Sequence, residues 1–235
     1  MARMAFPLEV RAVVFDAYGT LFDWASAAER SRDALGERWR ELAELWRTKQ
    51  LQYTWLRSLQ GRYADFHQVT GEALDFALAA LGLDDAALRT RLLALYERVD
   101  AYPDARETLE QLRASGRRTA ILSNGTPGML AEAAGSAGLA PLLDAVLSVD
   151  EVRTYKPHPS VYRLATDRLG LEPGELLFVS ANGWDAFSAR AFGLRVAWCN
   201  RNRQPPERLP ERPDVEVHSL LEVAALFGEV PGRNP

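Results

Sequence analysis

The sequence has few of the residues that form disulfides or bind zinc. Its 235 residues include one cysteine, Cys199, and three histidines, His67, His158 and His218. A single cysteine cannot form an intramolecular disulfide, which favours a reducing, cytoplasmic location. The histidines are scattered without the spacing of a zinc site. We therefore expect neither a disulfide framework nor a zinc centre.

Long apolar runs and an excess of positive charge are also absent. The first residues meet Glu9 and Arg11 before they reach the length of a signal peptide, and no later run approaches a transmembrane helix. The net charge is -4, whereas a nucleic-acid partner normally demands a basic face. Hydrophobic residues make up 47% of the chain and charged residues 26%, as in ordinary globular proteins. We expect no nucleic-acid or membrane partner.

An apolar segment near the N-terminus stops at a carboxylate. The residues from Val13 to Phe15 are apolar and rich in β-branched side chains, and Asp16 follows them directly. A turn comes next, in which Gly19 supplies a permissive backbone and Thr20 a hydroxyl. Asp16 is therefore predicted at the carboxyl end of a buried strand, where open α/β sheets bind their ligands.

The chain divides into a helical block and an alternating region. Residues 22–100 have helical periodicity, whereas helices and short strands alternate from Tyr102 onward. This alternation predicts a parallel sheet covered by helices and joined by right-handed crossovers. The predicted fold is α/β, with a Rossmann-like core (residues 8–21 and 101–230) and an inserted all-helical cap (residues 22–100). The expected strands are 119–123, 145–148, 176–180, 196–199 and 215–217, and the expected helices are 105–115, 127–137, 159–169, 185–192 and 220–227.

One apolar stripe in the predicted cap indicates an assembly. Its members recur at helical spacing and are more numerous than a thin cap is expected to bury. Exposed apolar patches of that kind usually mark an interface, and a two-fold dimer is the commonest outcome. We therefore predict a homodimer from the stripe Leu35, Trp39, Leu42, Trp46, Tyr53 and Leu56.

Three further polar motifs follow predicted strands. Ser123 and Asn124 end the second strand, Lys156 precedes a helix, and the segment from Ser180 to Asp185 joins a strand to a helix. Each motif alone is common in loops or at helix starts, so Asp185 could simply cap its helix. Four motifs in order at strand ends predict one convergent site.

These four segments resemble the motifs of the haloacid dehalogenase superfamily, whose first Asp is a nucleophile. Phosphatases of that superfamily carry a second Asp two residues later to protonate the leaving alcohol, and Tyr18 stands there. A halide leaves without a proton, so the resemblance favours dehalogenation. The metal-dependent members also have Gly-Asp where this chain has Ser180-Ala181, and Ala181 has no oxygen ligand. The resemblance implies a site without metal or cofactor, in which Lys156 neutralises Asp16 and Asp185.

Residues 45–59, 62–66 and 200–201 are similar to segments of the L-2-haloacid dehalogenases, so the resemblance covers nearly the whole chain, from about residue 11 to residue 228. It implies a small 2-halocarboxylate as substrate and a halide ion as product. Asp16 would attack C2 and form an aspartyl ester. Arg47 and Asn124 would receive the halide in a dry pocket shaped by Phe66. Ser123 and backbone amides from Ala17 onward would hold the substrate carboxylate.

The resemblance also implies how the ester is hydrolysed. Asn182 would position a water molecule and Asp185 would deprotonate it, so that an L-2-haloacid gives the D-2-hydroxy acid. The remaining residues would support these groups or line the substrate pocket: Tyr18, Thr20, Leu51, Lys156, Tyr162, Ser180 and Trp184. Thr48 departs from the pattern, because some relatives carry Gln there, and this affects the expected substrate range.

Two alternatives remain open at this point. A phosphatase of the same superfamily would lack its general acid and one metal ligand. A relative that only binds a ligand would be expected to have lost part of the catalytic set, yet every member is present. For Arg47 the simpler alternatives are a solvated helix residue or a partner of Glu44.

We predict that chelation leaves halide release unchanged. Ala181 supplies no ligand oxygen, and Lys156 supplies the positive charge that a metal would otherwise provide. The measurement is halide release from L-2-chloropropionate with and without EDTA. Activity that is lost in EDTA and restored by magnesium would contradict the prediction.

Overall fold

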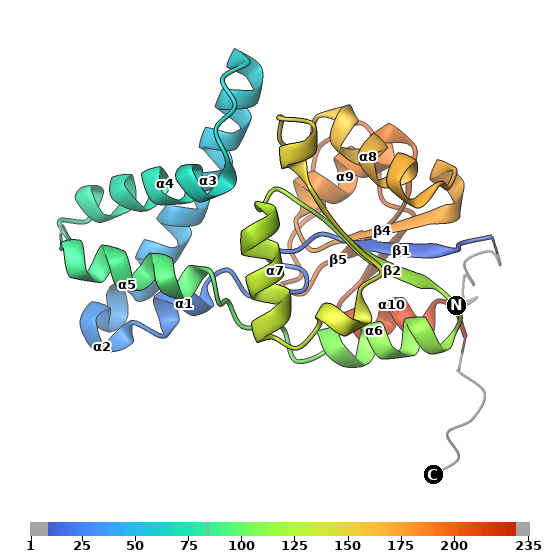
Figure 1. The fold of residues 1–235 in the computed structure, drawn as a ribbon, viewed down its shortest axis with the longest axis horizontal. Helices are drawn as coiled ribbons and strands as arrows, with labels where there is room; N and C mark the ends of the chain where they lie inside the picture. The colour runs from blue at the N-terminus through green and yellow to red at the C-terminus, as the bar shows by residue number, and fades with distance from the viewer. Residues whose placement is uncertain (1–8, 84, 229–235) are drawn as a thin grey trace, which may run out of the picture.

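A parallel six-stranded sheet forms the centre of the protein (Figure 1). The computed structural model describes residues 9–83 and 85–228. The spatial order of the strands is β3-β2-β1-β4-β5-β6, and every pairing is parallel. The predicted α/β fold is confirmed. The strands are β1 (Ala12–Phe15), β2 (Arg118–Ser123), β3 (Ala145–Ser148), β4 (Leu176–Ser180), β5 (Arg195–Cys199) and β6 (Val215–Val217).

Strand β1 lies in the middle of the sheet. All four of its residues are buried, which explains the unbroken apolar run in the sequence. Phe15 is aligned with Ile121 of β2 on one side and with Val179 of β4 on the other. The chain turns to β2 and β3 on one side of β1 and to β4, β5 and β6 on the other. Asp16 therefore follows β1 at the point where the strand order reverses, the usual ligand site of such sheets.

Helices cover both faces of the sheet, with α6 and α10 on one face and α8 and α9 on the other (Figure 1). The predicted helices and strands of this region are confirmed, and their ends differ by at most two residues. Asp185 lies inside the first turn of its helix, which begins at Gly183 rather than at Asp185. The helices are α6 (Ala105–Ala114), α7 (Pro127–Ser136), α8 (Pro159–Leu169), α9 (Gly183–Phe192) and α10 (Leu220–Ala225).

A separate group of helices lies beyond the carboxyl ends of the strands (Figure 1). Residues 36–38 form a short 3-10 helix, so Leu35 and Trp39 belong to different helices and the predicted single stripe is interrupted. Helix α4 begins at Phe66, where Asp65 accepts a hydrogen bond from the backbone N–H of Gln68 and caps it. These helices are α1 (Ser26–Glu29), α2 (Arg32–Leu35), α3 (Trp39–Gln60), α4 (Phe66–Ala80) and α5 (Ala86–Tyr96).

Most of the apolar stripe is buried inside this helical group. Leu35, Trp39, Leu42 and Trp46 are all buried, with α3 packed against α4. The argument that the cap cannot bury them is therefore wrong. Leu56 remains 47% exposed. The homodimer stays a prediction.

Two adjacent connections join the helical group to the sheet. The N–H of Asp23 donates to the carbonyl of Asp100 at 2.7 Å, and the N–H of Tyr102 donates to the carbonyl of Leu21 at 2.9 Å. The predicted limits between cap and core fall in these connections, while the outer limits of the core, at residues 8 and 230, lie outside the described residues. The division into domains stays a prediction. Within residues 9–83 and 85–228, no helix combines the length and the apolar character needed to cross a membrane.

We predict that Leu42→Ala destabilises the protein and that Leu59→Ala on the same helix does not. Leu42 is 0% exposed and Leu59 is 84% exposed. Emptying the Leu42 site is expected to lower the free energy of unfolding by about 2–5 kcal/mol. The exposed substitution is expected to change it by less than about 0.5 kcal/mol. Urea unfolding of both variants measures the difference, and equal losses would contradict the packing described here.

Candidate active site

The loop after β1 holds Asp16 against the neighbouring strand end. The N–H of Asp16 donates to the carbonyl of Val179 at 2.9 Å, which extends the pairing of β1 with β4 by one residue. The chain then turns at Gly19, whose φ is +95°, a conformation that side chains rarely adopt. A Cβ at Gly19 would also lie 3.4 Å from Trp24 and 3.5 Å from Asn182. The loop can therefore close over the site because this position has no side chain.

Two buried carboxylates share one ammonium group in the site. Lys156 Nζ lies 2.9 Å from Asp16 Oδ1 and 2.8 Å from Asp185 Oδ2. The three residues are 1%, 6% and 0% exposed, respectively. Thr20 Oγ1 and Asn182 Nδ2 donate to the second oxygen of Asp16, at 3.1 and 2.8 Å. The structure thus brings together five predicted site residues from segments far apart in the sequence.

The charge balance of this cluster explains its pKa values. Burial alone would lower the pKa of Lys156, but attraction to Asp16 and Asp185 outweighs it and raises that pKa. Burial raises the pKa of Asp185, the proximity of Asp16 raises it further, and Lys156 opposes both effects. One cation faces two anions, so electrostatic attraction stabilises the charged form of Lys156 more than the charged form of either carboxylate. Lys156 is therefore held charged, while Asp185 is a stronger base than an ordinary aspartate.

Two predicted supporting residues contact the cluster from different sides. Tyr162, on α8, donates its hydroxyl to Asp185 Oδ1 at 2.8 Å. The hydroxyl of Ser180 is joined to the backbone of Asn182, accepting from its N–H at 3.2 Å. Ser180 therefore orients the loop that carries Asn182 rather than bonding to either carboxylate. The predicted supporting role of Ser180 stays a prediction, and its contact with the site in this arrangement is through Asn182.

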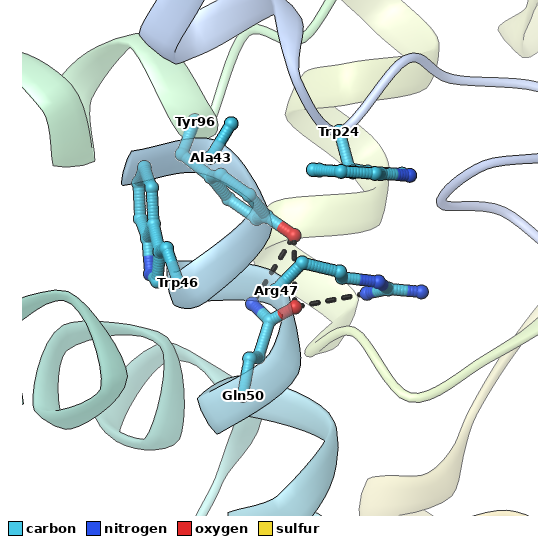
Figure 2. Close-up of a pocket in the computed structure, with 6 residues that line it drawn as sticks. All are labelled: Trp24, Ala43, Trp46, Arg47, Gln50 and Tyr96. Carbon is cyan, nitrogen blue, oxygen red and sulfur yellow. Dashed lines mark hydrogen bonds between the residues drawn. The ribbon is translucent and has the colours of Figure 1, made fainter. Parts of the chain in front are cut away.

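Arg47 reaches the site from helix α3. Its Nη2 lies 3.4 Å from the carbonyl of Tyr18 and 3.5 Å from Asn182 Oδ1, while Nη1 donates to Gln50 Oε1 at 2.9 Å. Trp24 lies over the guanidinium, 6.0 Å from ring centroid to Cζ (Figure 2). Arg47 takes part in none of the ion pairs found in the described residues, so the alternative pairing with Glu44 does not occur. A cation beside the Tyr18 carbonyl and Asn182 is left available for an anion.

The residues predicted to receive halide and carboxylate lie around this point. Asn124 Oδ1 accepts from the N–H of Lys156 at 3.1 Å, and the hydroxyl of Ser123 accepts from the N–H of Gly125. Both side chains therefore fix the loops beside Lys156. Phe66, the first residue of α4, is buried with its ring centroid 5.8 Å from that of Tyr18.

The other predicted pocket residues lie nearby but make fewer polar contacts. The carbonyl of Ala17 accepts the N–H groups that close the turn after Asp16. Leu51 is half-buried on α3, one turn after Arg47. Trp184, on α9, contacts Trp55 of α3 edge to face at 5.4 Å. The tryptophan pair is a direct contact between the helical group and the core.

Sequence reasoning missed the role of a partly buried ion pair behind the loop that follows Asp16. Arg201 makes two bonds to Asp104, at 2.8 and 2.9 Å, and also donates to the carbonyl of Thr20 at 3.1 Å. The sequence alone indicates Asp104 only as a turn or helix-start residue at the hinge. The presence of Asn200-Arg201 among the segments similar to relatives was the available signal. That Asp104 is the acid paired with Arg201 can be seen only in the tertiary structure.

A metal ion has little to bind near Asp16. The described part of the chain contains no group of three or more His, Cys, Asp or Glu side chains arranged to hold one. The space between Asp16 and Asp185 is occupied by the ammonium of Lys156, and Ala181 contributes only its N–H, which donates to Thr20 Oγ1 at 2.8 Å. The site instead places two buried carboxylates and a guanidinium close together, an arrangement that could support displacement of an anion.

Comparison with known proteins agrees with this arrangement. The profile of the haloacid dehalogenase-like hydrolases matches residues 10–193. The chain belongs to this family. The (S)-2-haloacid dehalogenase 4A of Burkholderia cepacia is 46% identical, over 94% of this chain and 96% of its own length. The (S)-2-haloacid dehalogenase 1 of Pseudomonas sp. (strain CBS-3) is 50% identical, over 93% of this chain and 96% of its own length.

Solved structures give the same assignment within the family. The L-2-haloacid dehalogenase of Xanthobacter autotrophicus has been solved with chloropropionic acid covalently bound. It matches this fold with a TM-score of 0.87 and 41% identity, over 92% of this chain and 98% of that one. The similarity to L-2-haloacid dehalogenases inferred from the motifs is confirmed.

We predict that Tyr162→Phe raises the pKa of Asp185. The tyrosine hydroxyl bonds to the ionised carboxylate and lowers its pKa. Removing the hydroxyl takes away one of the effects that oppose the rise in pKa caused by burial. Carboxyl carbon NMR of the Asp185 side chain should give a pKa above 3.8 in the unmodified protein and a higher one in the variant. Tyr53→Phe on α3 is the matched control and should leave the value unchanged. An Asp185 pKa at or below 3.8 in the unmodified protein would contradict the assignment.

Proposed function

We propose that the protein hydrolyses L-2-haloacids to D-2-hydroxy acids through an ester on Asp16. The observation that carries the proposal is the buried group of Asp16, Lys156 and Asp185 beside an Arg47 that no carboxylate neutralises. A small anionic substrate brings one carboxylate and releases one halide, and this site offers neutral N–H and O–H donors for the first and the Arg47 guanidinium for the second. The activities named for the relatives support the same reaction class.

In the first step, an oxygen of Asp16 attacks C2 of the substrate from the side opposite the halogen. The new C–O bond forms as the C–halogen bond breaks, and the electron pair leaves with the halide. C2 is inverted once. Arg47 stabilises the departing halide together with Asn124, in a pocket bounded by Phe66. Ser123 and the backbone N–H groups that follow Asp16 hold the substrate carboxylate.

In the second step, water attacks the side-chain carbonyl of Asp16. Asp185 takes a proton from the water, and the raised pKa of this carboxyl improves it as a base. The bond between the carbonyl carbon and the ester oxygen breaks, and Asp185 returns the proton to the departing alkoxide. Asp16 then loses its own proton to solvent. C2 is not attacked again, so the product keeps the inverted configuration.

Neither step requires a metal ion in this proposal. Lys156 supplies the positive charge between the two carboxylates, at 2.9 and 2.8 Å. A carboxylate at position 181, which phosphatases of the superfamily use, is replaced here by a methyl group. A cytoplasmic location and a homodimer remain part of the same proposal. The first rests on the lone buried cysteine and the second on the apolar side chains left exposed on α3.

We predict that product oxygen comes from Asp16 on the first turnover. With enzyme in excess over L-2-chloropropionate in 18O-labelled water, the label should enter Asp16 and not the hydroxy acid. Asp16→Asn should abolish halide release. Asp185→Asn should release about one equivalent of halide per site and then stall, because the ester forms but is not hydrolysed.

Mass spectrometry of the peptide containing Asp16 detects both the label and the stalled ester. Label in the product on the first turnover would contradict the ester and make Asp16 a base that activates water. A parallel assay of a phosphate ester with magnesium tests the phosphatase alternative. Phosphate release without halide release would overturn the proposed function.

A further inference from the structure

A buried polar network in the cap lies directly behind Arg47. Gln50 stands one turn after Arg47 on α3 and is 1% exposed. Its amide nitrogen donates to Thr70 Oγ1 of α4 at 2.8 Å and to the Tyr96 hydroxyl of α5 at 3.1 Å. Figure 2 shows Gln50 between Arg47 and Tyr96, with dashed bonds to both. None of the reaction steps above uses these three side chains.

The contact with Arg47 fixes which end of the Gln50 amide faces the guanidinium. The carbonyl oxygen Oε1 accepts from Arg47 Nη1 at 2.9 Å, the amide nitrogen donates to Thr70 Oγ1, and the Tyr96 hydroxyl contacts both amide atoms, at 3.1 Å from the nitrogen and 3.3 Å from Oε1. The reversed amide would place two donors against each other, because a guanidinium has no acceptor. Tyr96 stacks on Tyr18 at 5.5 Å, so the network also touches the loop that carries the nucleophile.

Gln50 makes the shortest hydrogen bond that holds the guanidinium. The contacts of Nη2 with the Tyr18 carbonyl and with Asn182 are longer, at 3.4 and 3.5 Å. All three partners are neutral acceptors, so they orient Arg47 without cancelling its charge. A charged group in a buried site interacts more strongly with an anion when no opposite charge already pairs with it.

We propose that Gln50 is a positioning residue that aims Arg47 at the leaving halide and keeps its charge available. Thr70 and Tyr96 act through Gln50 by holding its side chain in place beside Arg47. A carboxylate at this position would make the same bond but would neutralise the guanidinium. This inference deepens the proposed function and rests on it for the identity of the anion.

The direct test is Gln50→Glu. Glutamate has nearly the same shape, and the hydroxyls of Thr70 and Tyr96 can turn to donate to it, so the fold is expected to be kept. Bromide binding is followed by the fluorescence of Trp24 and Trp46, which line the pocket beside Arg47. We expect bromide affinity to fall about tenfold or more, because Arg47 then pairs with the introduced carboxylate instead of the anion.

The matched control is Gln52→Glu. It introduces the same charge on the same helix, but the side chain is exposed and bonded to Lys49. This variant should bind bromide as the unmodified protein does. The two variants have the same composition, so net charge alone cannot explain a difference between them.

Single-turnover kinetics distinguishes the loss of Arg47 positioning from a general structural effect on the site. Gln50→Glu should slow halide release from L-2-chloropropionate more than from L-2-bromopropionate, because the poorer leaving group depends more on Arg47. Hydrolysis of the ester depends on Asp185 and should keep its rate. Equal slowing of both steps, with no dependence on the halogen, would show a structural effect and overturn the inference.

A second variant keeps the inference testable if Gln50→Glu misfolds. Thr70→Val removes one holder of the Gln50 amide without adding charge, and it should weaken bromide binding in the same direction by a smaller factor. Bromide affinities equal to that of the unmodified protein in both variants would overturn the inference, as would an unmodified protein that binds no bromide. If bromide binds but no haloacid releases halide, the proposed function fails, and the bromide affinities alone decide the role of Gln50.

Discussion

The sharing of one ammonium group by two buried carboxylates is the constraint on which the site depends. Without Lys156, burying Asp16 and Asp185 together would be costly, and one of them would be protonated. With Lys156 between them, both carboxylates lie at bonding distance from the same nitrogen. The two carboxylates still differ in their hydrogen bonds. Asp16 also accepts hydrogen bonds from Thr20 and Asn182, whereas Asp185 accepts one from Tyr162. This inequality suits one carboxylate as nucleophile and the other as base.

The sheet makes this sharing possible. Lys156 is separated from Asp16 and Asp185 by 140 and 29 positions along the chain, yet all three follow strands or precede helices at the same edge. The reversal of strand order between β1 and β4 opens the space in which they meet. Behind it, Arg201 ties the carbonyl of Thr20 to Asp104, so the nucleophile loop is held from both sides. Rigid support of this kind is what preorganised electrostatics requires.

The helical group adds what the sheet lacks, a cation without a carboxylate partner. Arg47 extends from α3 toward Asp16 and is held by neutral oxygen atoms. In the proposed reaction, this group of helices therefore supplies a residue that takes part in the chemistry. Its polar interior at Gln50, Thr70 and Tyr96 is fully buried, and such networks are retained where orientation matters.

The sequence by itself determined the order and type of the core elements, because apolar runs and helical periods are local patterns. It also predicted Asp16, Lys156 and Asp185 as site residues, through motifs at strand ends, and the structure brings the three side chains together. Tertiary structure decided where the cap stripe is buried, because packing of α3 on α4 is not a local property. It likewise decided that Arg201 pairs with Asp104 and that Gln50 faces Arg47. Such contacts join residues whose spacing carries no signal, since their side chains meet only after the helices and loops have packed.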